Sequence, residues 1–406
     1  MRLWLAVRPN ARGKGKGDSG CRGYSDCWEH RRKMIYFDNA ATALPKAKSV
    51  ADAMKNALEI CGNPGRSGHV YSMKSAEIIY ECRKKLALMF NTRPECVIFT
   101  SGATESLNIA IKGTNRPGGV TVVSSMEHNS VLRPLNSLRR LGETVLRQFL
   151  VDVKSDARTL DNFSTVSRSA TSVVITHASN VCGRILPVRQ MRSLVDNEVV
   201  FILDASQTAG HIPLDIIDLG VDIMCIPAHK GLCGPMGVGA LIINPYSDII
   251  IDSLIEGGTG TNSKSLDMPE YYPERLEAGT LNVCGIAGFS AALDEFDFCQ
   301  SEKDIYSFLV NEMDNRVDIT LHGAHAEGSA ENYVPVILFN KKRLDCETVA
   351  SILSEKGFAL RAGFHCAPHA HRTLGTFETG GVRLSLGKVN TLDEAKLFLK
   401  ALDEIK

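Results

Sequence analysis

Residues 199–230, VVFILDASQTAGHIPLDIIDLGVDIMCIPAHK, contain two short apolar runs. The first run ends at Asp204, and the second ends just before His229 and Lys230. Short runs that are apolar throughout are typical of strands buried on both faces, as in a parallel sheet. Polar residues directly after such strands lie at the edge where open α/β sheets bind ligands. This stretch therefore predicts an α/β fold with a ligand site beyond the strand ends.

The same pattern extends to both sides of this stretch. Strands are predicted at 96–100, 120–124, 172–176, 199–203, 222–226 and 238–243, and helices at 77–90, 130–141 and 187–195. Alternating strands and helices predict a mainly parallel sheet with helices on both faces. A second unit follows, with strands predicted at 334–339, 358–361 and 382–386 and helices at 346–356 and 391–405.

The composition excludes several classes of partner. The 46 basic residues balance the 46 acidic ones, so no net charge favours nucleic acid or an anionic membrane, and neither partner is expected. No apolar run approaches the roughly 20 residues of a membrane-spanning helix. The 12 cysteines are scattered without zinc spacing, so we expect no metal and a reducing, cytoplasmic location. Residues 1–33 lack amphipathic periodicity and are expected to be a disordered or spurious extension, with Met34 a natural start.

Polar residues follow five of the predicted strands, at 101–105, 127–129, 177–180, 204–207 and 229–230. Each group alone has an ordinary explanation, such as a helix cap, a loop histidine or a solvated lysine. Together they supply an anion cradle, an aromatic side chain, a carboxylate, neutral hydrogen-bond donors and an amine. Pyridoxal phosphate requires this set, because its ring nitrogen needs an acid, its aldehyde a lysine and its phosphate free donors.

Five ordered motifs carry a family resemblance. They are YFDNAAT at 36–42, FTSGATE at 99–105, DASQ at 204–207, HKG with GP at 229–235, and RAGFHCA at 361–367. From about Ile35 onward the chain resembles the class V aminotransferase family of fold-type I pyridoxal-phosphate enzymes, and its cysteine desulfurases in particular. The resemblance implies a large domain at 51–294 with a mainly parallel seven-stranded sheet. It also implies a smaller C-terminal α/β domain at 295–406, with residues 34–50 packing against it, and a homodimer.

The resemblance also implies a role for individual residues. Lys230 would carry the cofactor as a Schiff base, Asp204 would face the ring nitrogen, and His128 would stack on the ring. The other implied cofactor ligands are Asn180 and Gln207 at the ring oxygen and Ala103, Thr104, His229 and the partner subunit's Thr280 at the phosphate. Arg383, with Asn180, would bind the substrate carboxylate. Pro227 stands where many relatives have a serine or threonine, so one phosphate contact is in doubt and weaker cofactor retention is expected.

Cys366 decides between the reactions that this cofactor permits. It could be a core cysteine in a turn, but His365, His369, His371, Arg361 and Arg372 lie near it in sequence and would stabilise a thiolate. The chain is therefore predicted to be a sulfurtransferase that converts L-cysteine to L-alanine, with a persulfide on Cys366. A protein sulfur acceptor or an iron–sulfur cluster scaffold would then collect the sulfur.

Two alternatives remain open at this point. A selenocysteine lyase would use the same site. A class V aminotransferase or carbon–sulfur lyase would use the cofactor and leave Cys366 incidental.

Overall fold

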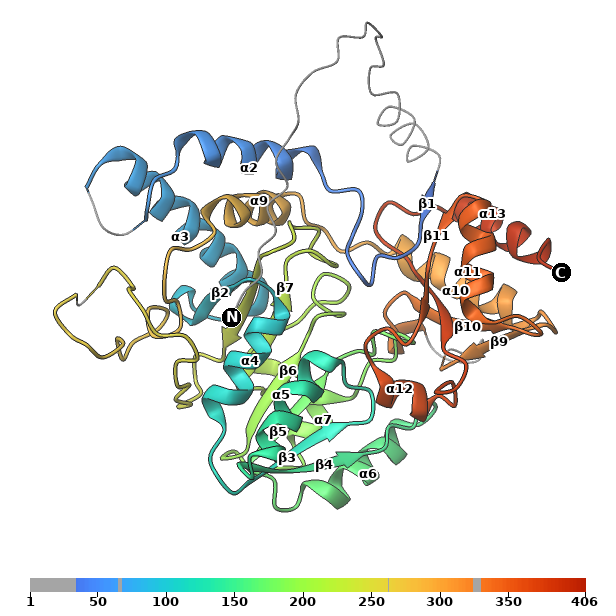
Figure 1. Ribbon diagram of the computed structural model, residues 1–406, viewed down its shortest axis with the longest axis horizontal. Coiled ribbons are helices and arrows are strands. Elements are labelled where there is room, and N and C mark those ends of the chain that lie inside the picture. Colours follow the sequence, from blue (N-terminus) through green and yellow to red (C-terminus); the bar gives the residue numbers. More distant parts are fainter. Residues whose placement is uncertain (1–33, 65–67, 262, 324–329) are drawn as a thin grey trace, which may run out of the picture.

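The computed structural model describes residues 34–64, 68–261, 263–323 and 330–406, so the expectation for residues 1–33 lies outside the described part (Figure 1). The largest sheet contains β2 (Val97–Thr100), β3 (Gly119–Ser124), β4 (Thr144–Phe149), β5 (Ser172–Thr176), β6 (Val200–Asp204), β7 (Ile223–Pro227) and β8 (Gly239–Ile243). Their order is β2-β8-β7-β6-β5-β3-β4. β8 is antiparallel to β2 and β7, and the other neighbours are parallel. The predicted mainly parallel, seven-stranded sheet is confirmed.

Strand β4 was not among the strands predicted from apolar runs. It lies at the edge of the sheet, where Val145 is 52% exposed and the sequence TVLRQF mixes polar with apolar residues. An edge strand packs only in part, so its sequence lacks the continuous apolar run of a central strand.

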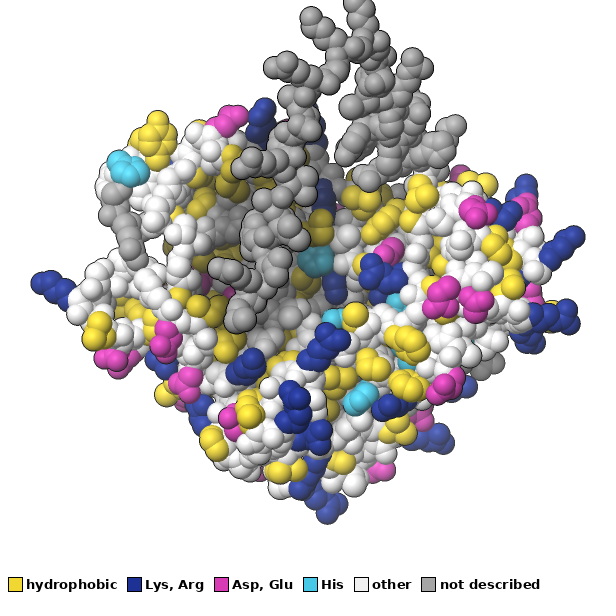
Figure 2. Space-filling view, viewed as in Figure 1, with side chains coloured by type: hydrophobic (Ala, Val, Ile, Leu, Met, Phe, Trp, Pro, Cys, Tyr) yellow, Lys and Arg dark blue, Asp and Glu magenta, His cyan; other side chains and the backbone are white. Residues whose placement is uncertain are grey.

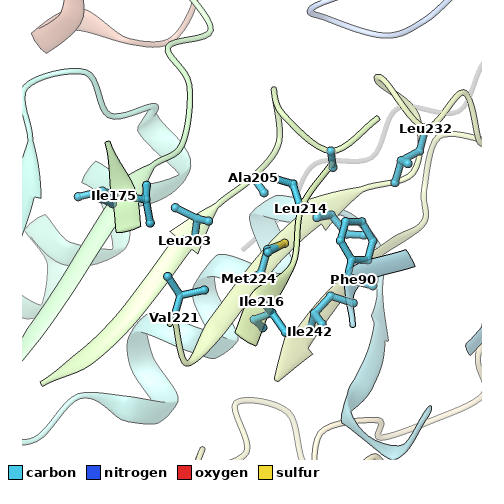
Figure 3. Packing of buried hydrophobic residues seen from close by; sticks show 14 of the residues in the cluster. Phe90, Ile175, Leu203, Ala205, Leu214, Ile216, Val221, Met224, Leu232 and Ile242 are labelled. Carbon is cyan, nitrogen blue, oxygen red and sulfur yellow. The ribbon is translucent and has the colours of Figure 1, made fainter. Parts of the chain in front are cut away.

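Helices cover both faces of this sheet (Figure 1). They are α2 (Lys48–Ile60), α3 (Val70–Phe90), α4 (Ala103–Thr114), α5 (Asn129–Arg140), α6 (Asp156–Ser167), α7 (Val188–Arg192), α8 (Ile216–Leu219) and α9 (Val283–Asp294). Adjacent strand residues belong to different cores: Val173 packs in the cluster that includes Phe90 of α3, and Val174 in the cluster that includes Leu107 of α4. Figure 3 shows part of the first cluster, with Phe90 beside Ile242. Burial on both faces explains why these strands read as unbroken apolar runs.

A smaller, antiparallel sheet has the strands β9 (Ile319–His322), β10 (Val336–Lys341), β12 (Arg361–Gly363) and β13 (Gly381–Ser385), in the order β12-β13-β10-β9. It packs with α10 (Ser301–Asp314), α11 (Cys346–Glu355) and α13 (Leu392–Asp403) around its own apolar cluster. The remaining helices of the described residues are η1 (Pro94–Cys96), η2 (Ala330–Asn332) and α12 (Pro368–Thr373). At the start of α13, Thr391 and Glu394 form a reciprocal capping box, as the sequence there indicates.

The N-terminal strand β1 (Ile35–Tyr36) pairs in parallel with β11 (Phe358–Ala359), which lies more than 300 residues later in the chain. The next residues continue alongside β13, where Asp38 bridges to Ser385, and Phe37 is fully buried in the core of the smaller sheet. This pairing brings Asp38 close to the site described below. The domain limits given above stay predictions.

No helix within the described ranges is long and apolar enough to cross a membrane.

Candidate active site

A cavity of about 320 Å³ lies beyond the carboxyl ends of the parallel strands. Its lining consists of Ser101, Gly102, Ala103, Thr104, Glu105, His128, Ser130, Thr176, Asn180, Asp204, Ser206, Gln207, Pro227, His229 and Lys230. The structure therefore brings together every predicted cofactor ligand except Thr280. Sequence analysis did not single out Ser130, Thr176 or Ser206 as ligands. Ser206 could have been found, because it lies inside the DASQ motif.

One end of the cavity is formed by the turn before α4. Gly102 has a φ of 153° and provides no side-chain cap for the helix. The amides of Ala103 and Thr104 consequently donate to no acceptor among the described residues. A Cβ on Gly239 would lie 2.6 Å from the Cα of Gly102, so glycine is needed for β8 to pack against this turn. Free amides at a helix N-terminus form a favourable site for a phosphate.

Asp204 supplies a buried carboxylate at the end of β6. The residue is 3% exposed, and its Oδ1 accepts a hydrogen bond of 2.9 Å from the amide of Ser206. Its Oδ2 accepts none from the described residues. Asp204 lines the cavity, so its free oxygen can accept a hydrogen bond from a protonated ring nitrogen.

Lys230 provides the amine. Its Nζ makes no hydrogen bond or ion pair with any described residue, and burial lowers the pKa of the amine to about 8. The nearby Asp204 and Asp38 oppose this shift, whereas Arg383 and Arg361 add to it. A lysine with a lowered pKa and no partner is available as a nucleophile.

His128 is the N-cap of α5 and lines the cavity. Its Nδ1 accepts a hydrogen bond of 3.0 Å from the amide of Ser130, so the ring proton of the neutral form is on Nε2. Burial and the adjacent Lys230 lower the pKa of His128 to about 4, which makes the ring neutral at physiological pH. A neutral ring can stack on an aromatic cofactor without adding charge to the site.

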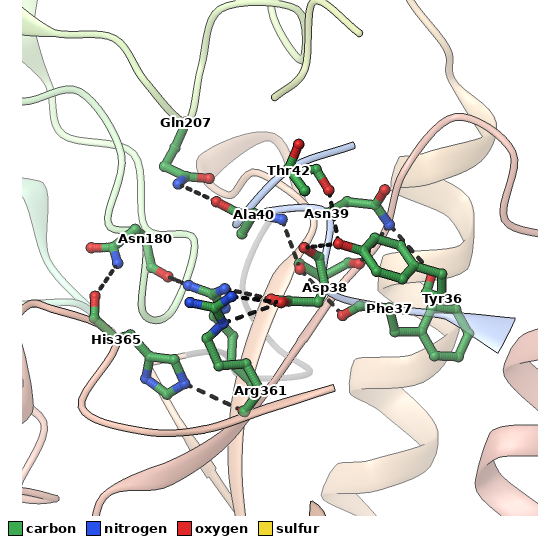
Figure 4. Close-up of polar contacts among 12 residues, drawn as sticks. Tyr36, Phe37, Asp38, Asn39, Ala40, Thr42, Asn180, Gln207, Arg361 and His365 are labelled. Carbon is green, nitrogen blue, oxygen red and sulfur yellow. Dashed lines mark hydrogen bonds and ion pairs between the residues drawn. The ribbon is translucent and has the colours of Figure 1, made fainter. Parts of the chain in front are cut away.

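The side-chain amides of Asn180 and Gln207 are partly engaged. Asn180 Nδ2 donates to the carbonyl of His365 at 2.7 Å, and Gln207 Nε2 donates to the carbonyl of Ala40 at 3.1 Å (Figure 4). Each amide group carries two N–H donors, so each side chain retains one for a ligand. Their contact with the cofactor ring oxygen stays a prediction.

Cys366 lies beside this cavity. The described cysteines are all free, and Cys366 is the one among them that is exposed. It lines a second cavity of about 500 Å³, which shares Thr104, His128 and Ser130 with the cavity of Lys230. The two cavities are therefore neighbours, and the thiol lies in the one next to the place where the cofactor is expected.

The expectation that nearby histidines add positive charge to Cys366 is wrong. Burial lowers the pKa of His365 to about 3 and that of His371 to about 4, and it also lowers the pKa of His369. All three rings are neutral at physiological pH, because the sequence shows only their proximity and not their burial. The basic residues that line the cavity of Cys366 are Lys112 and Arg133.

Arg383 is 2% exposed and does not line the cavity of Lys230. Its guanidinium donates to Asp38 Oδ1 at 2.7 Å and to the carbonyl of Asn180 at 3.0 Å, whereas its Nε is buried without a partner. Asp38 also pairs with Arg361 at 3.1 Å. Asp38 was not among the predicted site residues, and only its place in the YFDNAAT motif could have indicated a role. Binding of a substrate carboxylate by Arg383 stays a prediction.

Thr280 is exposed and lines a different cavity, together with Arg83 and Glu277. The structure does not bring it to the Lys230 cavity of its own chain. Its contribution to the site of a partner subunit stays a prediction.

The donor set fits pyridoxal phosphate. Free amides, an unpaired carboxylate oxygen and an unpaired amine line one cavity, and the Nδ1 of His229, another lining residue, is buried without a hydrogen bond. Within the described ranges, no cluster of acidic, histidine and cysteine side chains could hold a metal ion.

The lowered pKa of Lys230 predicts how cofactor uptake depends on pH. In cofactor-free protein, the rate at which this amine condenses with added pyridoxal phosphate should rise about tenfold per pH unit and level off above about pH 8. The rate rises with pH because the neutral amine is the nucleophile. The neutral fraction of the amine grows steeply below its pKa and approaches one above it. Stopped-flow absorbance over a pH series measures this rate, and a plateau only near the ordinary pKa of lysine would contradict the prediction.

Comparison with known proteins agrees with this site. The family described as aminotransferase class-V matches residues 35–398. A probable cysteine desulfurase of Methanothermobacter thermautotrophicus is 30% identical, over 92% of this chain and 95% of its own. The cysteine desulfurase IscS of Dictyoglomus turgidum is 31% identical, over 92% of this chain and 95% of its own. The apo structure of cysteine desulfurase from Thermococcus onnurineus NA1 superposes with a TM-score of 0.84 and 28% identity, covering 92% of this chain and 95% of that one.

Members of this family use pyridoxal phosphate, for which the cavity of Lys230 has the required donors. From the matched residues and the relatives, the chain belongs to the class-V aminotransferase family.

Proposed function

We propose that the protein is a cysteine desulfurase, which converts L-cysteine to L-alanine and keeps the sulfur as a persulfide on Cys366. The observation that carries the proposal is the exposed Cys366 thiol in a cavity that shares Thr104, His128 and Ser130 with that of Lys230. An aminotransferase would not need a thiol there. The names of two relatives at 30% and 31% identity support the same reaction.

Lys230 acts first as the attachment point and then as a base. When bound, pyridoxal phosphate withdraws electrons from the α-carbon of an amino acid. Once released by the substrate, the Lys230 amine can accept the α-proton, because its lowered pKa places it near neutrality. Asp204 would place its carboxyl group next to the ring, and His128 remains neutral beside it.

Cys366 performs the sulfur transfer. Its thiolate attacks the substrate sulfur, so that an S–S bond forms while the bond between that sulfur and the β-carbon breaks. The β-carbon takes the electron pair and, after protonation, the three-carbon product is alanine. One thiol and one cysteine thus give one persulfide and one alanine, without an external oxidant or reductant.

The second cavity offers a route for the acceptor. It runs between α4 and α5 and includes Lys112 and Arg133, and Figure 2 shows Lys and Arg side chains gathered over these helices. We propose that a thiol of a sulfur acceptor or an iron–sulfur scaffold reaches the persulfide along it. The free cysteines of the described part support a reducing compartment, the cytoplasm.

A homodimer is part of the proposal. Exposed apolar side chains on α2 and α3, among them Leu58, Val70, Met73 and Leu88, support an interface between subunits. Thr280 is exposed and does not line the Lys230 cavity of its own chain, so it would then complete the phosphate site of the partner subunit.

The proposal predicts one added sulfur atom on Cys366 after incubation with L-cysteine in the absence of an acceptor. Intact mass followed by peptide mapping measures the position, and alanine formed in the same samples gives the stoichiometry. Sulfur found only on another cysteine would contradict the assignment. Parallel turnover of L-selenocysteine distinguishes a selenocysteine lyase, which would strongly prefer that substrate.

A further inference from the structure

Cys366 lies in a turn whose backbone conformation is rarely adopted by residues that have a Cβ. His365 has a φ of 51° and Cys366 a φ of 55°, so two consecutive residues with a Cβ are in the left-handed region. Such a turn persists only where its surroundings hold it. Two hydrogen bonds do so from the cofactor side: Asn180 Nδ2 to the carbonyl of His365 at 2.7 Å, and the amide of Asn129 to the carbonyl of Cys366 at 2.8 Å.

A chain of hydrogen bonds holds the turn from the opposite side. Thr376 Oγ1 lies 2.7 Å from His371 Nδ1, and His371 Nε2 lies 3.2 Å from His365 Nδ1. His365 Nε2 lies 3.3 Å from the carbonyl oxygen of Arg361. The two rings are nearly parallel, with 15° between their planes. His371 is fully buried, Thr376 is 1% exposed and His365 8% exposed, so water does not replace these partners.

The Arg361 carbonyl, at one end of this chain of hydrogen bonds, fixes which atom donates in each of them. A carbonyl oxygen cannot donate, so His365 Nε2 must carry the proton in its bond to Arg361. The Nδ1 of a neutral His365 is then an acceptor, His371 must donate from Nε2, and the Thr376 hydroxyl must donate to His371 Nδ1. The opposite direction would place the lone pair of His365 Nε2 against the Arg361 carbonyl. It would also direct the Thr376 hydroxyl to the His371 carbonyl at 3.4 Å, which already accepts from the Thr376 amide at 2.8 Å.

The charges around the rings agree with neutral imidazoles. Burial is the main cause that lowers the pKa of His365, with Arg383 and Arg361 adding to it. Burial also lowers the pKa of His371, and His322 acts in the same direction. No carboxylate among the described residues forms a hydrogen bond or ion pair with either ring. A neutral pair of this kind needs one defined tautomer at each ring.

We propose that Thr376 and His371 are positioning residues for Cys366: through the ring of His365 they hold the left-handed turn that places the thiol in the cavity next to that of Lys230. Neither side chain lines that cavity, so each acts through the turn. The effect on sulfur transfer rests on the function proposed above. The existence of the hydrogen-bond chain does not depend on that function.

Histidine tautomers test the chain directly. In protein labelled with ¹⁵N-histidine, long-range ¹H–¹⁵N spectra should show both rings in the Nε2–H form, with Nδ1 an acceptor. Thr376→Val removes the donor to His371 and should change the His371 Nδ1 shift most, with a smaller change at His365. A ring protonated on Nδ1, or on both nitrogens, at physiological pH would overturn the assignment.

Kinetics test the positioning role. Thr376→Val should lower the rate of persulfide formation on Cys366 about tenfold, as expected for the loss of one buried hydrogen bond, and leave KM for L-cysteine unchanged. Thr376→Ser keeps the hydroxyl and should restore the rate. Thr373→Val is the matched control at the last residue of α12, three positions before Thr376, because the Thr373 hydroxyl donates to the His369 carbonyl and not to a ring.

The outcomes separate the two proposals. A Thr376→Val variant with the wild-type rate, or a Thr376→Ser variant as slow as Thr376→Val, would overturn the positioning role. Wild-type protein that forms no persulfide would count against the proposed function. The histidine tautomers, measured by the ¹⁵N spectra, would still decide whether the chain of hydrogen bonds exists.

Discussion

Cys366→Ala is expected to abolish alanine formation from L-cysteine, by about 10³-fold or more, because no other described thiol is exposed at the site. The same variant should bind pyridoxal phosphate as the wild type does, since the thiol lies in the adjoining cavity and not among the residues that line the cavity of Lys230. Alanine production and cofactor absorbance in the same preparation measure both properties.

Cys61→Ala is a suitable control for this experiment. Cys61 is also a free cysteine and is only partly buried, but it follows α2 and lines neither cavity. It should retain full activity. If Cys366→Ala still released alanine at the wild-type rate, Cys366 would not be the residue that receives the sulfur. If the wild type formed pyruvate or a keto acid from L-cysteine in place of alanine, the carbon–sulfur lyase or aminotransferase interpretation would replace the desulfurase.

Lys230→Ala should lose covalent cofactor attachment and activity together. Borohydride fixes a lysine Schiff base irreversibly, so the wild type should retain the cofactor after denaturation and the variant should not. Turnover should fall by about 10³-fold or more, because the variant lacks both the attachment point and the base. Spectra before and after borohydride treatment, with turnover on the same samples, measure the two losses.

Lys46→Ala provides the contrast. Burial also lowers the pKa of Lys46 to about 8, but its amine donates to the carbonyl of His229 at 2.7 Å and is therefore engaged. That variant should still yield a borohydride-fixed cofactor. Attachment that survived in Lys230→Ala and disappeared in Lys46→Ala would reassign the Schiff base.

The sequence alone was sufficient to predict the mainly parallel sheet, with six of its seven strands located, and the group of residues expected to hold the cofactor. Strands buried on both faces must be apolar throughout, so β5, β6 and β7 could be located from short runs. Parallel strands end at the same edge of a sheet, so the polar residues after them, such as Asp204 and Lys230, could be predicted to meet. The structure confirms that they line one cavity. Edge strands β4 and β9 lack that apolar signal and were missed.

Only the tertiary structure decided what surrounds Arg383 and Cys366. Asp38 lies 345 residues before Arg383, and their ion pair depends on β1 pairing with a strand near the other end of the chain. The histidines near Cys366 suggested positive charge, but burial makes them neutral hydrogen-bond partners. Sequence patterns report local periodicity and residue type. Burial, and contacts between distant segments, are set by how the whole chain packs.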